Sequence, residues 1–216
     1  MMSSYIKKLI REGEHQCLDF KFEISDAKKI ARSVVAFANT KGGTLLIGVK
    51  DNGTIGGIRS EEEYYMVESA AELFSKPAVE FQTKEWFIEG RYVLEVYIPK
   101  SKQMPHYAKN KEGLWRAYIR VNDQNFLAND VLLKVWKRKK QTSGVRFKFS
   151  KNERLLLDFL TENQIITLTK FCKLAKINRR DAKNILANLI SIKVIDIVFT
   201  DDTVYYQLTT EYQKSE

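Results

Sequence analysis

Along residues 18–53, the spacing of apolar positions is first that of a strand, then that of a helix, and then that of a buried strand. Residues 18–22 alternate between apolar and charged side chains and predict a short strand. Residues 27–39 predict a helix, because their apolar members recur at helical spacing behind a candidate N-cap, Asp26. Residues 44–49 are apolar enough for a buried strand, and Asp51-Asn52-Gly53 predicts the turn that follows it.

The pattern continues with a mixture of helices and hairpins up to residue 139. We expect helices at residues 61–74 and 128–139 and strands at residues 79–88, 91–98 and 114–121. Glu89-Gly90 joins two alternating segments, as is typical of a β-hairpin. This order of elements indicates an α/β or an α+β fold.

A change of composition near residue 140 predicts a domain boundary. Lys137-Arg138-Lys139-Lys140 ends a helical pattern, and the polar segment 141–144 follows. The sequence therefore predicts two domains, residues 1–140 and 145–216. In the second we expect helices at residues 152–160, 167–175 and 179–191, capped in the last two cases by Thr167 and Asn178, and strands at residues 194–200 and 203–208. Three helices followed by a hairpin is the order of a winged helix-turn-helix.

Composition narrows the class of protein. The 216 residues carry 36 Lys and Arg against 27 Asp and Glu, a net charge of +9, which is compatible with a polyanionic partner. Two cysteines, Cys17 and Cys172, are too few for a disulfide scaffold and fit a reducing compartment. No apolar run is long enough to cross a membrane, and the charged first residues lack a signal-peptide pattern. We therefore expect a cytoplasmic protein without a membrane partner.

Glycines punctuate the segment from residue 36 to residue 57. Gly42 and Gly43 follow a predicted helix, so backbone N–H groups and Lys41 could face an anion there. The alternative is a tight connection between the helix and the next strand. An ATP-binding phosphate loop is excluded, because the order is Lys-Gly-Gly-Thr and the motif GxxxxGK[ST] is absent.

Four motifs together resemble the AlbA-like Schlafen domain. They are AFANTKGG (residues 36–43), IGVKDNG (47–53), DFK (19–21) and YIRV (118–121), and the resemblance spans roughly residues 10–135. It implies an α+β fold with a mixed sheet and binding to DNA or RNA, and the order of elements after it adds the smaller winged-helix domain. The family commonly continues YIRV with Gly-Ser, where this chain has Asn122-Asp123.

The same family includes members that cut RNA with three carboxylates. The resemblance places Glu14, Asp19 and Asp51 at those positions, although family nucleases usually have Glu where this chain has Asp19. Carboxylates suit Mg²⁺ or Mn²⁺, which could polarise a phosphodiester. The alternative is structural: Glu14 is a solvated acid, Asp19 pairs with a lysine, and Asp51 caps its turn.

Basic and aromatic side chains supply candidates for contacts with nucleic acid. Expected phosphate contacts are Lys21, Arg32, Lys41, Arg116 and Arg120 in the first domain, and Arg179, Arg180 and Lys183 on the third helix of the second. Asn178 and Asn184 could read base edges there, whereas Asp181 and Asp201-Asp202 would repel phosphates. Trp86, Trp115 and Trp136 could stack on bases, but their spacing favours the core.

Three functions remain open on these observations. The leading interpretation is a nucleic-acid-binding protein that acts as a transcriptional regulator. A metal-dependent endoribonuclease and a protein-interaction adaptor are the alternatives. Because Schlafen proteins carry two copies of this domain side by side and this chain carries one, a homodimer could rebuild the pair.

Overall fold

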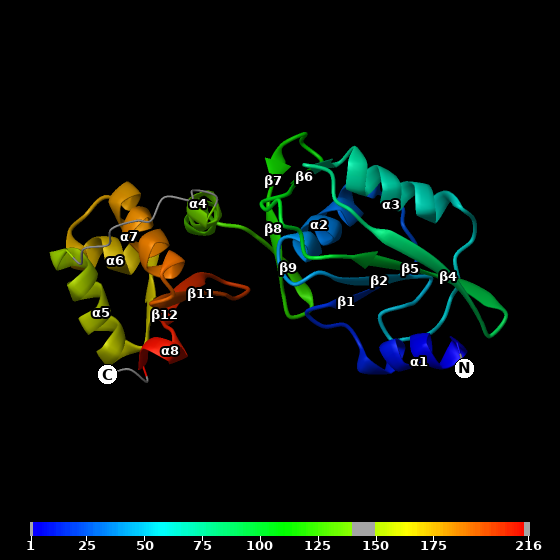
Figure 1. Cartoon of the computed structure of the whole chain (residues 1–216), viewed down its shortest axis with the longest axis horizontal. Helices are drawn as coiled ribbons and strands as arrows, with labels where there is room; N and C mark the ends of the chain where they lie inside the picture. Colours follow the sequence, from blue (N-terminus) through cyan, green and yellow to red (C-terminus); the bar gives the residue numbers. More distant parts are fainter. Residues whose placement is uncertain (1, 140–149, 214–216) are drawn as a thin grey trace. The chain divides into compact units, whose positions relative to one another are not determined.

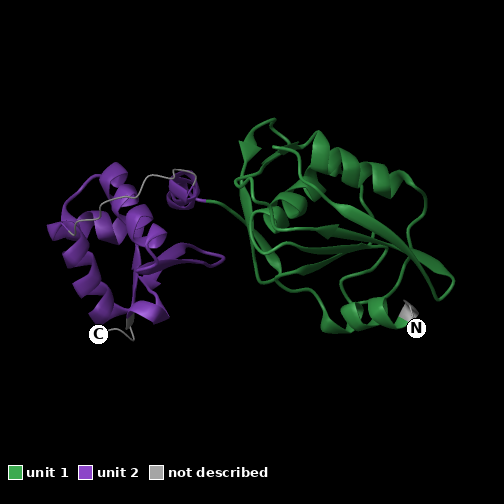
Figure 2. Cartoon of the chain, viewed as in Figure 1, with its two compact units in different colours: residues 1–128 green, residues 129–216 purple. Residues whose placement is uncertain are grey.

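The chain forms two compact units, residues 1–128 and residues 129–216 (Figure 2). The computed structural model describes residues 2–139 and 150–213. The boundary expected at residues 140–145 lies outside the described residues. The structure divides the chain after Ala128 instead, so the basic helix α4 (Asp130–Lys139) belongs to the second unit.

A four-stranded mixed sheet forms the centre of the first unit. Its strands run in the order β1 (Leu18–Lys21), β2 (Gly43–Ile47), β5 (Arg91–Ile98) and β4 (Gln82–Ile88). β1 and β2 are parallel, and the other neighbours are antiparallel. The expected α+β fold with a mixed sheet is therefore confirmed for this unit.

Smaller sheets extend the first unit beyond the central one. β3 (Ser75–Lys76), β6 (Tyr107–Lys109) and β7 (Trp115–Arg116) form a three-stranded sheet, in that order. β8 (Tyr118–Val121) and β9 (Gln124–Leu127) form a hairpin. Figure 1 shows both groups of strands at the same end of the unit.

Helices cover both faces of the central sheet (Figure 1). α2 (Ala27–Ala38) and α3 (Glu62–Glu72) pack on one face, against Leu45 and Ile47 among others. α1 (Met2–Glu12) packs on the opposite face, where Ile6 meets Leu46 in a second apolar cluster. The alternation of successive side chains along β2 between these two clusters is what a strand buried on both faces requires.

The second unit begins with α4 and continues through a helical segment to a small sheet. Its further elements are α5 (Lys151–Asn163), β10 (Ile165–Thr167), α6 (Leu168–Ala175), α7 (Arg179–Ser191), β11 (Ile195–Phe199), β12 (Val204–Leu208) and α8 (Thr210–Gln213). The sheet is antiparallel, in the order β10-β12-β11. Thr167 and Asn178 cap α6 and α7 through their side chains, as expected. Among the described residues, no helix has the length and apolar character to cross a membrane.

Candidate nucleic-acid interface

The glycines after α2 allow close packing and do not form an anion cradle. The Gly42 N–H donates to the Phe37 carbonyl at 2.9 Å, and Gly43 already pairs in β2. A Cβ on Gly42 would lie 2.8 Å from Lys100 N, and one on Gly43 would lie 2.4 Å from the Phe37 ring. The expectation of anion-facing N–H groups at Gly42 and Gly43 is therefore wrong, and the tight connection is confirmed. Lys41 itself is exposed.

Gly43→Ala tests this role directly. The added methyl group has no space between the Phe37 ring and the Cys17 carbonyl. We expect the free energy of unfolding to fall by about 1–3 kcal/mol, the usual cost of overpacking. Urea denaturation measures the loss. Nucleic-acid affinity measured below the unfolding transition should not change; a loss of affinity with unchanged stability would reinstate the cradle.

Two of the three predicted metal ligands meet at the start of β1. Glu14 Oε1 accepts a hydrogen bond of 2.7 Å from Phe20 N. Burial raises the pKa of Glu14; the Phe20 N–H opposes this rise and the neighbouring Asp19 carboxylate adds to it. Lys21 Nζ lies 3.0 Å from Asp19 Oδ2 and 3.9 Å from Glu14 Oε1. Lys21 therefore serves as a counterion to these carboxylates.

Arg120 is a second counterion to Asp19, from a segment 101 residues away. Its Nη2 lies 3.2 Å from Asp19 Oδ1 and donates to the Leu18 carbonyl, while Nε donates to the His15 carbonyl. The guanidinium also lies over the Phe37 ring, 5.0 Å from its centroid. The Arg120 side chain is only 1% exposed, which leaves it no surface for the phosphate contact that the sequence suggested.

Asp51 does not complete a three-carboxylate group. It is exposed in the turn after Val49. No group of three or more His, Cys, Asp or Glu side chains within residues 2–139 and 150–213 could hold a metal ion. Two cations and a backbone N–H already engage Glu14 and Asp19. This arrangement does not fit a Mg²⁺ or Mn²⁺ site built from the three carboxylates.

Metal addition provides the corresponding prediction. We expect millimolar Mg²⁺ or Mn²⁺ to leave the melting temperature unchanged. A metal ion raises the melting temperature only if it binds the folded protein, and the three carboxylates do not form a site for it. Differential scanning fluorimetry of the wild type and of Asp51→Asn makes the comparison. A rise in melting temperature that Asp51→Asn abolishes would show that the carboxylates converge on a metal.

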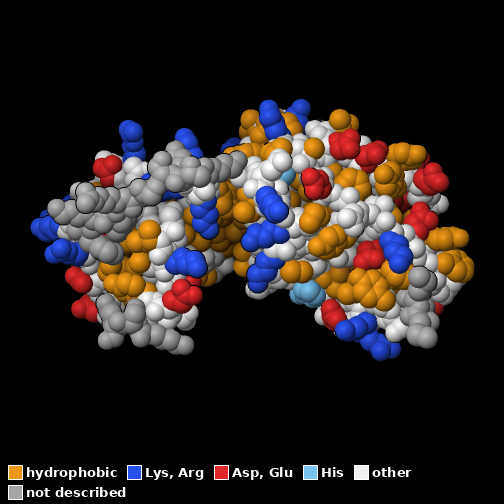
Figure 3. All heavy atoms as spheres, viewed as in Figure 1, with side chains coloured by type: hydrophobic (Ala, Val, Ile, Leu, Met, Phe, Trp, Pro, Cys, Tyr) orange, Lys and Arg blue, Asp and Glu red, His pale blue; other side chains and the backbone are white. Residues whose placement is uncertain are grey.

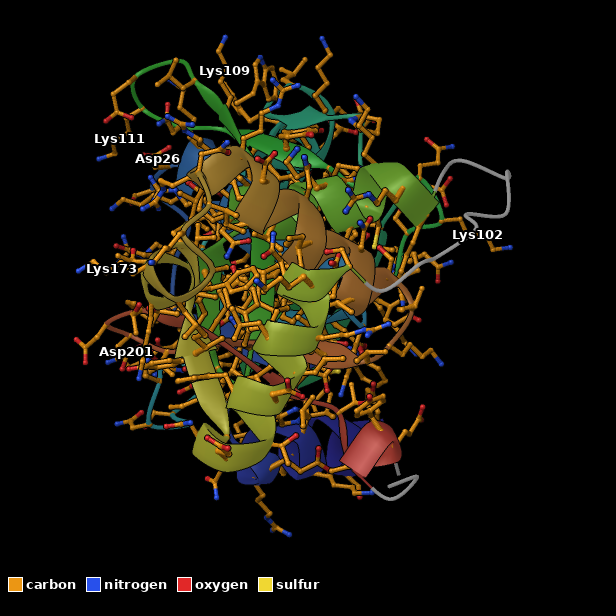
Figure 4. The ribbon with its side chains drawn as sticks, turned by 90° about the vertical axis from the view of Figure 1, so that its left-hand side faces the viewer. Asp26, Lys102, Lys109, Lys111, Lys173 and Asp201 are labelled. Atoms are coloured by element: carbon orange, nitrogen blue, oxygen red, sulfur yellow. The ribbon has the colours of Figure 1, made fainter. Side chains whose placement is uncertain are left out.

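Basic and aromatic side chains gather instead around β6 and β7. We call this the β6–β7 surface and define it by Lys28, Arg32, Lys109, Trp115 and Arg116. Trp115 is 38% exposed, Lys109 Nζ lies 5.9 Å from its ring centroid, and Arg116 follows it in β7. Figure 3 shows Lys and Arg beside hydrophobic side chains at this end of the unit, and in Figure 4 Lys109 and Lys111 point outward there.

Lys28 and Arg32 extend the surface onto α2. Lys28 Nζ lies 5.6 Å from the ring centroid of Phe74, whose carbonyl accepts a hydrogen bond from Lys109 N. Arg32 lies 5.8 Å from the Tyr118 ring centroid, and its Nε is buried without a hydrogen-bond partner among the described residues. The surface therefore combines four cations with one exposed indole ring.

Of the predicted phosphate contacts, the structure brings Arg32 and Arg116 into this surface. Lys28, Lys109 and Lys111 were not singled out from the sequence, although the segment KNKEGLWR places two lysines and an arginine around an aromatic residue. Of the three tryptophans, Trp86 and Trp136 are buried as expected, whereas Trp115 is exposed. For Trp115 the expectation of a core position is wrong.

In the second unit, side chains of α4 contact two of the residues with which the predicted recognition helix α7 was expected to bind DNA. Lys183 Nζ pairs with Asp130, and Lys134 Nζ donates to Asn184 Oδ1 at 2.9 Å. Arg179 and Arg180 stay exposed in the first turn of α7. The acidic turn at Asp201-Asp202 is also exposed, and Asp201 points outward in Figure 4.

Parts of this chain are similar to known proteins. The model of the Schlafen AlbA_2 family matches residues 14–129, more than half of the chain. The DIP2311 protein from Corynebacterium diphtheriae has 20% identity and a TM-score of 0.46, over 67% of this chain and 32% of its own. This chain therefore spans about a third of that protein. The N-terminal domain of a RecG-related protein from Nitrosomonas europaea has 19% identity and a TM-score of 0.40, over 69% of this chain and 98% of its own. No curated protein matches the chain.

Proposed function

The chain belongs to the Schlafen AlbA_2 family, and from this premise we propose that its first unit binds nucleic acid through the β6–β7 surface. The observation that carries the proposal is an exposed indole beside a cation: Trp115 is 38% exposed, Lys109 Nζ lies 5.9 Å from its ring centroid, and Arg116 is the next residue of β7. Phosphates attract the cations without regard to sequence, and the ring offers a face on which an unpaired base can stack. The surface therefore suits a single strand or an unpaired segment of DNA or RNA.

For the second unit we propose a winged-helix fold in a transcriptional regulator. The order of α5, β10, α6, α7, β11 and β12, with a three-stranded antiparallel sheet, supports this assignment. Arg179 and Arg180 are then the contacts to duplex DNA, because α4 engages Lys183 and Asn184.

Arg180→Glu tests the contribution of the second unit. We expect weaker binding of duplex DNA and a smaller salt dependence, because a phosphate contact is lost and a repulsive charge is introduced. Lys183→Glu is the matched comparison, and its effect on DNA binding should be smaller because Lys183 already pairs with Asp130. Fluorescence anisotropy with a labelled duplex measures both. The reverse order of effects would place the contact at the middle of α7.

The experiment for the first unit is an anisotropy titration with a labelled single-stranded oligonucleotide at several salt concentrations. We expect the logarithm of the binding constant to fall linearly with that of salt, with a slope of about −0.7 for each phosphate contact. Lys109→Glu combined with Arg116→Glu should weaken binding and flatten the slope. Lys84→Glu is the control, since Lys84 lies over Trp86, which packs with the α1 cluster. Equal losses in both variants would reject the β6–β7 surface.

A further inference from the structure

The loop after β5 contains a serine and a histidine joined by a short hydrogen bond. Ser101 Oγ lies 2.6 Å from His106 Nε2, and His106 Nδ1 lies 2.9 Å from the Pro77 carbonyl oxygen. Since a carbonyl only accepts, Nδ1 of the neutral ring carries the hydrogen, and Nε2 accepts the Ser101 hydroxyl. This arrangement has the three parts of an activated nucleophile: a hydroxyl, a base, and a group that orients the base.

The end of α2 holds both residues through their backbones. Asn39 Oδ1 accepts a hydrogen bond of 2.8 Å from His106 N, and Asn39 Nδ2 donates to the His106 carbonyl at 2.9 Å. The Ala38 carbonyl accepts from Ser101 N at 2.9 Å. Asn39 is buried, so the clamp is shielded from water. The pair is therefore fixed to a regular element rather than to a loose loop.

Ser101 and His106 open onto a pocket of about 360 Å³, a volume suited to a small molecule. Two cations, Lys100 and Lys102, and one acid, Glu80, also line it. Gln103 N donates to Ser101 Oγ at 3.0 Å, and the Ser101 hydrogen is given to His106. Ser101 therefore offers the pocket a lone pair and no hydrogen, which suits an electrophilic carbon and does not suit a phosphate oxygen.

We propose that Ser101 is a nucleophile for a carboxylic ester that carries an anionic group, an activity separate from nucleic-acid binding. Ser101 Oγ attacks the ester carbonyl carbon and gives its proton to His106 Nε2, which passes the proton to the departing alcohol. Water then attacks the acyl group on Ser101; His106 takes a proton from the water and returns it to Ser101 Oγ. The products are an acid and an alcohol, and Lys100 and Lys102 supply positive charge for the anionic group and the developing oxyanion.

A fluorophosphonate probe, followed by peptide mass spectrometry on the full chain, tests the proposal. We expect one adduct at Ser101, absent in Ser101→Ala and present in Ser25→Ala, a serine that lines a different pocket. His106→Asn should slow labelling by about 100-fold or more, the contribution of a general base. A missing Ser101 adduct, or a rate that His106→Asn leaves unchanged, would overturn the proposal.

If His106→Asn does not fold, Ser101→Cys takes its place. A thiol beside His106 Nε2 should react with iodoacetamide at pH 7 about tenfold or more faster than Cys172, because a neighbouring imidazole favours the thiolate. Equal rates would overturn the proposal. Trp115→Ala separates this activity from nucleic-acid binding: it should weaken binding to a single-stranded oligonucleotide and leave labelling of Ser101 intact, so either hypothesis can fail alone.

Discussion

Arg120→Met is expected to lower the free energy of unfolding by about 3–5 kcal/mol, the usual cost of removing one partner from a buried ion pair. Asp19, whose side chain is 5% exposed, would lose the guanidinium that lies 3.2 Å from its Oδ1. The Leu18 and His15 carbonyls would lose a donor as well. Urea denaturation followed by circular dichroism measures the change.

Arg116→Met is the matched control for this substitution. Arg116 is exposed in β7, so the same change should cost within about 0.5 kcal/mol. Asp19→Asn introduced together with Arg120→Met should recover part of the loss, because it removes the carboxylate charge that Arg120 no longer balances. If Arg120→Met costs no more than Arg116→Met, Arg120 is not the counterion of Asp19.

Trp115→Ala is expected to weaken binding to a single-stranded oligonucleotide by about 5- to 150-fold, which corresponds to the loss of one base–aromatic stack of about 1–3 kcal/mol. Because the ring is 38% exposed, the melting temperature should change little. Anisotropy titration measures the affinity. Trp115→Phe keeps an aromatic face and should retain most of it. If Trp115→Ala binds like the wild type, the ring does not take part in binding.

The sequence predicted those elements whose signals are local. α2 is an example: its apolar spacing and the Asp26 cap, which accepts a hydrogen bond from Lys28 N, belong to one short segment. The hairpin of β4 and β5 likewise follows from alternation on either side of Glu89-Gly90. α1 was not predicted, because its stability depends on packing Ile6 against the sheet rather than on any cap or turn.

Local sequence patterns could not predict the contacts between segments that are far apart in the chain. Asp19 and Arg120 are 101 residues apart, so nothing near Arg120 marked it as a buried counterion rather than a surface cation. The packing role of Gly43 depends in the same way on the Cys17 carbonyl in a neighbouring segment. α4 was assigned to the first domain by its place before the basic run, whereas its contacts with α7 place it in the second unit.

The exposure of Trp115 has a physical reason that periodicity does not reveal. Alternation assigns a strand residue to a buried face only where another layer covers that face. β7 is two residues long and lies at the edge of a three-stranded sheet, next to β6 only. Both of its residues are exposed, and the ring packs against the Lys109 side chain instead of a core.

Ultraviolet crosslinking of the full chain to a single-stranded oligonucleotide, with the attached peptide identified by mass spectrometry, tests the central claim most directly. Binding at the β6–β7 surface places a base against the indole of Trp115, so the main crosslink should fall within residues 109–116 and disappear in Trp115→Ala. A main crosslink at another segment, or one that survives this substitution unchanged, would contradict the assignment of the nucleic-acid interface to this surface.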